Sequence, residues 1–128
     1  MHPNGELIRS GFEAFAKGDM DTVGTLFDDD LVWHSAGTSV LAGDFVGKAA
    51  VFGLFGKLFE VTEGTFRQEI HALLADDDHV VVLADFSEDK PRPFTSQQVF
   101  VWHLRDGKAT ECWAIPLDQA GAAAALAQ

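Results

Sequence analysis

Four side chains in this sequence could transfer a proton, and each lies beside an apolar segment that could shield it: His34, Asp85, Glu111 and Asp118. An imidazole titrates near neutral pH, so His34 could act as a general base or anchor a substrate. The alternative is a histidine at a loop edge that hydrogen-bonds to the backbone. Asp118 could assist the imidazole, or it could cap the Ala-rich segment that follows it. Asp85 ends an alternating apolar stretch whose inward face the sequence does not determine.

The position of Glu111 follows from the turn that precedes it. Asp106-Gly107 between two apolar runs predicts a two-residue hairpin. If Leu104 pairs with Ala109, the flanking residues separate into two faces. One face carries the bulky residues Gln98, Phe100, Trp102, Leu104, Glu111, Trp113 and Ile115. The other carries Val99, Val101, His103, Thr110, Cys112 and Ala114. We expect the bulky face to line a pocket and the smaller, mostly apolar face to form a homodimer interface.

A carboxylate among aromatic rings loses hydration, which raises its affinity for a proton unless a cation meets it. Glu111 could therefore be an acid/base group or a polar anchor in the pocket. It could equally pair with Arg67 or Arg105, or reach solvent at a strand end.

The composition limits the partners of the chain. Its 128 residues fit one domain, 1–128, and 47% hydrophobic with 23% charged residues is typical of a globular protein. The 9 Lys and Arg against 20 Asp and Glu give a net charge of −11, which argues against nucleic acid or an anionic membrane as a partner. No apolar run reaches the roughly 18 residues of a membrane span, and the N-terminus lacks the pattern of a secretory signal. We therefore expect a cytoplasmic protein.

Neither a metal site nor a cofactor is expected. The single cysteine, Cys112, excludes an internal disulfide and a cysteine-based zinc site. The histidines show no His-x-His or His-Glu-x-x-His spacing, and the Asp triplets lack the ligand spacing of a calcium loop. The sequence has no Tyr, so any mechanism must work without a phenol.

The elements that would position these residues change type halfway along the chain. The first half predicts a helix ending at Gly18, a short helix capped by Asp19, a turn at 28–30, a strand at 31–34, a loop at 35–47 and a helix from Lys48 to about Phe59. The second half predicts strands at 65–74, 79–86, 94–104 and 108–115, followed by a short C-terminal helix. Helices followed by an antiparallel sheet indicate an α+β fold, whose curved sheet would enclose a cone suited to a small molecule.

Motifs over nearly the whole chain carry a family resemblance. They are Lys17-Gly18-Asp19-Met20-Asp21, Leu26-Phe27-Asp28-Asp29-Asp30, Gly43-Asp44-Phe45-Val46-Gly47, and Arg105-Asp106-Gly107-Lys108 with Glu111 and Trp113. They resemble the nuclear transport factor 2-like superfamily, and within it the SnoaL-like group of polyketide cyclases, related to ketosteroid isomerase. The resemblance implies a cystatin-like cone, usually a homodimer, in which three N-terminal helices cross the concave face of a curved antiparallel sheet. The superfamily holds isomerases, cyclases, dehydratases, epoxide hydrolases and binding modules, so the fold does not fix the activity.

The ketosteroid isomerase branch implies a role for His34. That branch places a general-base Asp three residues before a Gly in the loop after the first strand, and His34 occupies this position. Its two oxyanion donors, a Tyr and a protonated Asp, correspond to positions near Gly11 and Phe100. Both donors are missing, so steroid isomerisation is not predicted.

Two other branches imply roles for carboxylates. Limonene epoxide hydrolases use an Asp on the last strand, close to the position of Ile115, and an Asp–Arg pair on an earlier strand. Asp85 could correspond to the Asp of that pair. SnoaL-like cyclases use an Asp late in the chain as general acid/base, and Asp118 is the best match.

The sequence therefore predicts a cofactor-independent enzyme of isomerase, cyclase or dehydratase type. It would bind an apolar, carbonyl-bearing metabolite in the cone and move a proton with His34, helped by Asp118 or Asp85. The residues expected to contact the substrate are Trp33, Phe55, Phe59, Phe100, Trp102, Glu111, Trp113 and Ile115. The alternative is a non-catalytic small-molecule-binding or dimerisation module of the same fold, and a further alternative is an epoxide hydrolase.

Overall fold

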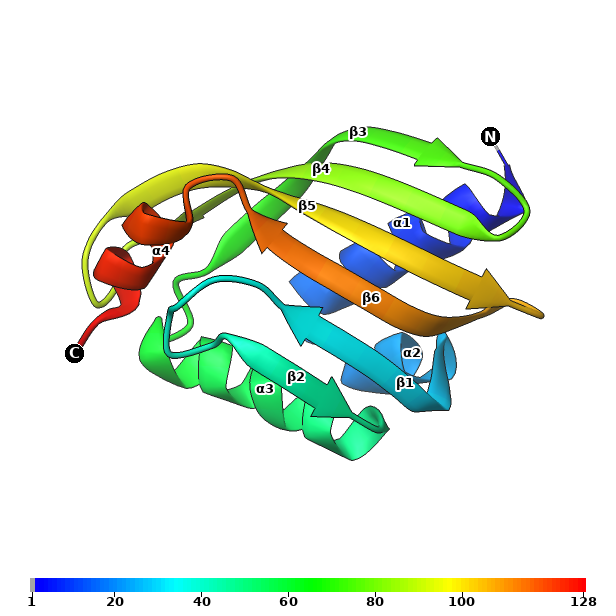
Figure 1. Cartoon of the computed structure of the whole chain (residues 1–128), viewed down its shortest axis with the longest axis horizontal. Coiled ribbons are helices and arrows are strands. Elements are labelled where there is room, and N and C mark those ends of the chain that lie inside the picture. Colours follow the sequence, from blue (N-terminus) through cyan, green and yellow to red (C-terminus); the bar gives the residue numbers. More distant parts are fainter. Residues whose placement is uncertain (1) are drawn as a thin grey trace.

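In residues 2–128, which the computed structural model describes, a six-stranded sheet curves around a group of helices (Figure 1). The helices are α1 (Pro3–Ala16), α2 (Met20–Thr25), α3 (Lys48–Val61) and α4 (Gln119–Leu126). The strands are β1 (Phe27–Ser35), β2 (Gly43–Val46), β3 (Arg67–Ala75), β4 (His79–Glu88), β5 (Phe94–Arg105) and β6 (Lys108–Pro116). These elements confirm the predicted α+β class.

The helix ends follow local chemistry that the sequence shows. Helix α1 is followed by Gly18, whose φ of 73° lies in the left-handed region that favours glycine. Asp19 caps α2, because its side chain accepts a hydrogen bond from the Thr22 amide at 3.2 Å. None of the helices in the described chain has the length and apolar character needed to cross a bilayer.

The sheet has the strand order β2-β1-β6-β5-β4-β3. Neighbouring strands run antiparallel except β1 and β6, which are parallel and join the two halves of the chain. In this parallel pair Trp33 lies opposite Cys112, and His34 lies opposite Trp113. Because side chains alternate along a strand, Trp33 and His34 project from opposite faces of the sheet.

The main core lies between the concave face of the sheet and helices α1, α2 and α3. Val80, Val82 and Ala84 alternate along β4 and are fully buried. Leu31 of β1 and Val51 of α3 are equally inaccessible. Two predicted details were wrong, because the acidic run 28–30 continues β1 and the predicted loop 35–47 contains β2. The acidic side chains of 28–30 remain outside the core while their backbone stays extended, and β2 is an edge strand with little buried surface of its own.

Candidate functional site

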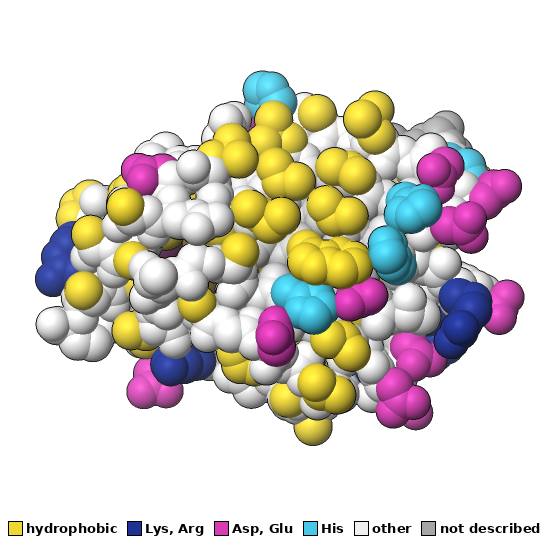
Figure 2. Space-filling model, in the orientation of Figure 1, with side chains coloured by type: hydrophobic (Ala, Val, Ile, Leu, Met, Phe, Trp, Pro, Cys, Tyr) yellow, Lys and Arg dark blue, Asp and Glu magenta, His cyan; other side chains and the backbone are white. Residues whose placement is uncertain are grey.

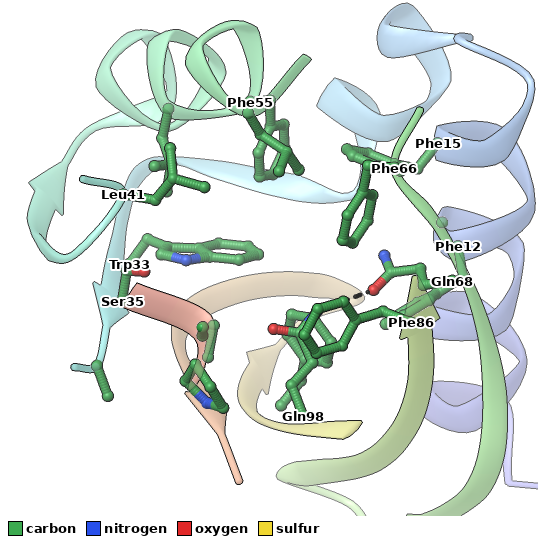
Figure 3. A pocket seen from close by; sticks show the side chains of 18 of the residues that line it. Phe12, Phe15, Trp33, Ser35, Leu41, Phe55, Phe66, Gln68, Phe86 and Gln98 are labelled. Carbon is green, nitrogen blue, oxygen red and sulfur yellow. Dashed lines mark hydrogen bonds between the residues drawn. The ribbon is translucent and has the colours of Figure 1, made fainter. Parts of the chain in front are cut away.

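A cavity of about 140 Å³ lies between the concave face of the sheet and helices α1 and α3 (Figure 3). Cavities of roughly 150 Å³ hold a molecule the size of benzene, so this one suits a small ring. Helix α4 contributes Ala122 and Leu126 to the wall. Most of the lining side chains are aliphatic or aromatic, which favours an apolar ligand.

Aromatic rings in contact with one another form much of the cavity wall. The ring of Trp33 meets those of Phe55 and Trp102 edge to face, with centroids 5.2 and 5.3 Å apart. Phe100 also lines the cavity, so four of the predicted substrate contacts are placed where a ligand could touch them. Phe59 does not line the cavity and stacks on Phe15 instead, at 5.2 Å.

Among the described residues, Glu88 supplies the only carboxyl group of the cavity wall. It is the last residue of β4, it is 3% exposed, and its Oε2 has no hydrogen-bond partner. Its cross-strand neighbour is Phe94, and the ring of Phe86 lies 5.9 Å from those of both Phe66 and Phe94. Burial raises the pKa of Glu88 to about 7, because a carboxylate deprived of water is disfavoured relative to the neutral acid.

The nearby arginine does not neutralise Glu88. Arg92, in the loop after β4, has its Nη1 at 2.9 Å from the carbonyl oxygen of Ala124, 3.3 Å from that of Ala125 and 2.5 Å from that of Ala127. The guanidinium therefore holds the C-terminal end of α4 beside the β4–β5 connection (Figure 1). A carboxyl group without a cation and with a pKa near 7 populates both protonation states at neutral pH, which is what a general acid or base requires.

A few uncharged polar groups complete the cavity wall. The amide of Gln98 on β5 donates from Nε2 to Oε1 of Gln68 on β3 at 3.2 Å, and Figure 3 shows both side chains at the cavity. The indole Nε1 of Trp102 is buried without an acceptor. Such groups orient a ligand in a pocket that is otherwise apolar.

His34 lies on the opposite face of the sheet from the cavity, so the prediction that its ring reaches into the cone was wrong. Its Nδ1 lies 2.7 Å from Oδ1 of Asp44 on β2, and its Nε2 lies 2.7 Å from Oε2 of Glu111 on β6. The ring also stacks on Trp113 at 5.1 Å. The hydrogen bond with Glu111, followed by that with Asp44, raises the pKa of His34. Carboxylates only accept, so an imidazole bonded to one at each nitrogen is a cation, and here it links three strands.

Asp85 and Asp118 also lie outside the cavity wall. Asp85 accepts a hydrogen bond from Gln97 Nε2 at 2.7 Å, and this bond lowers its pKa. Asp118 caps α4, since its Oδ1 accepts from the Gly121 amide at 2.8 Å. The structure therefore does not bring the three predicted catalytic side chains to one place, and none of them reaches the cavity.

The β5–β6 hairpin contains a bulge that reverses the predicted faces of β6. Leu104 pairs with Ala109 as predicted, but His103 then pairs with Glu111. Thr110 is an extra residue, and a shift of one residue moves each later side chain of the strand to the opposite face. The predicted pocket residues that face outward instead are Glu111, Trp113 and Ile115. Cys112 and Ala114, which were predicted on the smaller outer face, face inward instead.

Glu88 is the functional candidate that the sequence-based prediction missed. Val80, Val82, Ala84 and Phe86 are all buried, and Glu88 is the next member of this alternating series. The predicted strand ended at Phe86, two residues before the observed end. An apolar alternation that continues into a carboxylate is therefore the pattern that identifies the residue.

The described residues support neither a metal site nor a nucleophilic cysteine. Within residues 2–128, no three His, Cys, Asp or Glu side chains converge where a metal ion could bind. The Cys112 side chain is fully buried, and burial raises the pKa of its thiol. A thiol in this state is a poor nucleophile.

The sequence and the fold both match known proteins. The model of the SnoaL-like domain family matches residues 8–112, whereas a search of curated proteins finds no significant match. The structure of Bal32a, from a soil-derived mobile gene cassette, has a TM-score of 0.92 with 28% identity over 97% of this chain and 96% of that one. A Xanthomonas campestris protein of unknown function with a cystatin-like fold has a TM-score of 0.87 with 27% identity over 98% of each chain.

A further structural match comes from Streptomyces antibioticus. IdmH, a proposed polyketide cyclase, has a TM-score of 0.80 with 20% identity over 98% of this chain and 99% of that one. Identity at this level shows a shared fold only. Together these matches confirm the predicted nuclear transport factor 2-like, cystatin-like architecture.

Proposed function

The chain belongs to the SnoaL-like domain family, and from that premise we propose that it is a cofactor-independent enzyme with Glu88 as its acid/base group. It would act on an apolar, carbonyl-bearing metabolite by isomerisation, cyclisation or dehydration. The observation that carries this proposal is the Glu88 carboxyl group, which lines an aromatic cavity, is 3% exposed and has an unpaired oxygen. A buried titratable group in a small-molecule cavity is a typical mark of a catalytic site.

The proposed chemistry is proton transfer next to a carbonyl group. The Glu88 carboxylate takes a proton from the carbon beside the carbonyl, and the electron pair of that C–H bond moves into the enolate. The resulting carboxylic acid then returns the proton to the same carbon, giving exchange, or to another carbon of the conjugated system, giving an isomer. A pKa of about 7 suits both steps, because the two forms of Glu88 are populated together near neutral pH.

The geometry supports this role for Glu88 better than the alternatives drawn from the sequence. His34, Asp85 and Asp118 do not line the cavity, so none of them is placed to reach a ligand held there. Epoxide hydrolysis needs paired carboxylates around a water molecule, and the described cavity wall contains the Glu88 carboxyl group alone.

Hydrogen–deuterium exchange on a small cyclic ketone tests the proposal. Wild-type protein in D2O should accelerate exchange of the protons beside the carbonyl of 1-indanone, followed by proton NMR. Glu88→Gln should reduce this acceleration by about 100-fold or more, as expected when a general acid/base is lost. Asp85→Asn changes a carboxylate on the same strand but the outer face, and it should leave the rate unaltered. Equal rates in wild type and Glu88→Gln would contradict the proposal.

A non-catalytic binding module is the second candidate, and the nearly continuous apolar wall favours it. In that case 1-indanone binds, but neither wild type nor Glu88→Gln exchanges its protons faster than buffer alone. Because binding is measured separately from exchange, the two functions give different results in the same set of samples.

We further propose that two copies of the chain pack through the outer face of the sheet. Leu74, Val81, Val101 and Trp113 form a row of cross-strand neighbours there, and Figure 2 shows hydrophobic side chains gathered on this face beside histidines and acidic groups. Leu74 is 73% exposed, and extended apolar patches of this kind favour association. Sedimentation should give a dimer for wild type and a monomer for Val101→Glu, and a monomeric wild type at micromolar concentration would refute the interface.

A further inference from the structure

We propose that the amides of Gln68 and Gln98 are the polar anchor for the carbonyl group of the ligand, and that the cavity thereby selects uncharged ketones over carboxylates. This inference rests on the proposed function, because it assigns the residues that hold the substrate beside Glu88.

The two amides meet across the strand that lies between them. Gln68 is on β3 and Gln98 is on β5, and their side chains are joined by the hydrogen bond of 3.2 Å. The β4 residue opposite Gln98 is Ala84, whose single methyl group is too short to separate the two amides. The pair therefore forms an uncharged polar spot on the sheet wall of a mostly apolar cavity (Figure 3).

The pair keeps unused hydrogen-bonding capacity on the cavity side. A glutamine amide has two N–H donors and an oxygen with two lone pairs. The mutual bond uses one donor of Gln98 and one lone pair of Gln68, and no other hydrogen bond of these two side chains occurs within residues 2–128. The N–H groups of Gln68 thus remain free to donate to a carbonyl oxygen. A hydrocarbon that filled the cavity would shield these N–H groups from water without offering an acceptor, which is costly, whereas a ketone would supply one.

The register places this anchor next to Glu88. Gln68 pairs with Phe86, and Glu88 is two residues further along β4 on the same face. Gln68 and Glu88 are therefore diagonal neighbours, whose backbones lie about 7–8 Å apart in a regular sheet. A carbonyl oxygen on the Gln68 amide would leave the adjacent carbon facing the Glu88 carboxyl group.

The described cavity wall has no cationic side chain that could pair with an anionic ligand. None of the described residues that line the cavity is Lys, Arg or His. A carboxylate would lose its hydration on entry without gaining a counter-ion, and burying an unpaired charge is strongly unfavourable. Ionised Glu88 would also repel it, and the net charge of the chain is −11.

Binding of indane, 1-indanone and 1-indanecarboxylate tests the inference, since these probes share one ring system and differ in a single group. The titrations follow the indole signals of Trp33 and Trp102, which line the cavity, by NMR of nitrogen-15-labelled protein. Wild type should bind 1-indanone about five- to tenfold more tightly than indane, the gain expected from one hydrogen bond. It should bind 1-indanecarboxylate at least about tenfold more weakly than 1-indanone.

Variants assign the preference to the amides. Gln68→Met with Gln98→Met keeps side-chain length and removes both amides, so indane and 1-indanone should then bind within about twofold of each other. Each single variant should show a smaller preference for 1-indanone over indane. The single variants replace the double variant in this test if the double variant does not fold. Gln97→Met is the matched control, because Gln97 is on the same strand but bonds to Asp85 outside the cavity, and it should keep the full preference.

The outcomes separate this inference from the proposed function. Equal affinities of wild type for indane and 1-indanone, or a preference that survives in the double variant, would overturn the anchor even if exchange depends on Glu88. Tight binding of 1-indanecarboxylate would overturn the selection against anions. A preserved preference without any exchange would instead remove the catalytic role and leave the anchor standing. Failure of all three probes to bind would remove both.

Discussion

Replacement of Glu88 by glutamine should remove a pH-dependent cost to the stability of the fold. Burial raises the pKa of this carboxyl group from 4.5 to about 7, so the native chain holds the proton at pH values where the unfolded chain has released it. Between these two values unfolding releases a proton, and the free energy of unfolding therefore falls as pH rises. Below pH 4.5 both states are protonated and the effect vanishes, and above pH 7 the effect is complete.

The size of the effect follows from the same interval. From 4.5 to about 7, at about 1.4 kcal/mol for each pH unit, the cost at alkaline pH is about 3 kcal/mol. At pH 5 most of it is absent, and about 1 kcal/mol remains. Glutamine has no proton to release, so Glu88→Gln should gain about 2 kcal/mol in stability relative to wild type between pH 5 and pH 8.

Urea unfolding of both proteins at each pH from 5 to 9, followed by circular dichroism, measures this difference. Effects of the substitution that do not depend on pH cancel when the difference is compared between pH values. Asp85→Asn is the control, because Asp85 has a lowered pKa and titrates below this range. A difference between Glu88→Gln and wild type that stays constant from pH 5 to pH 8, or shrinks as pH rises, would show that the carboxyl group is not buried without a counter-charge.

Four further predictions concern residues outside the cavity. Asp44→Asn removes one of the carboxylates that raise the pKa of His34, so NMR of the imidazole should show titration at lower pH, and an unshifted midpoint would contradict the strand link. The same raised pKa means that the stability contributed by the His34 cation is complete below pH 6.5 and is lost as pH rises through the native value. Asp118→Ala should lower the free energy of unfolding by about 1 kcal/mol through loss of the α4 cap while 1-indanone binds as before; weakened binding would instead favour the catalytic hypothesis for this residue. Cys112 should react with a thiol reagent only when urea unfolds the chain, and rapid labelling of the native protein would disprove its burial.

Most of the fold is predictable from the sequence because its signals are local. The helix ending at Gly18, the Asp19 cap and the Asp106-Gly107 turn all depend on residues within a few positions of one another, and all are present in the structure. Strand β2 was missed because its Gly43–Val46 segment is short and exposed. Its pairing with β1, not its own sequence pattern, makes it a strand.

The candidate site was harder to predict because one extra residue in a strand moves all later side chains of that strand to the opposite face of the sheet. Leu104 and Ala109 pair as expected, yet the bulge at Thr110 turns Glu111 and Trp113 outward. No turn residue marks this bulge in the sequence, and alternation alone cannot locate it. Alternation along β1 explains the direction of His34. Trp33 points into the cavity, so the next side chain, His34, points outward.

The carboxyl group whose burial lowers the stability of the fold is also the group available for proton transfer. A leucine or glutamine at position 88 would avoid the desolvation cost, so the carboxyl group is a local exception in an alternating apolar series, and such exceptions are expected where a protein acts on a ligand. If one group is responsible for both effects, the native pKa of Glu88 must appear in both measurements. The rate of exchange should have its midpoint near the pKa of about 7 that burial imposes on Glu88, and the stability difference between wild type and Glu88→Gln should stop growing at the same pH. An exchange midpoint far from the pH at which the stability difference levels off would mean that stability and proton transfer depend on different groups.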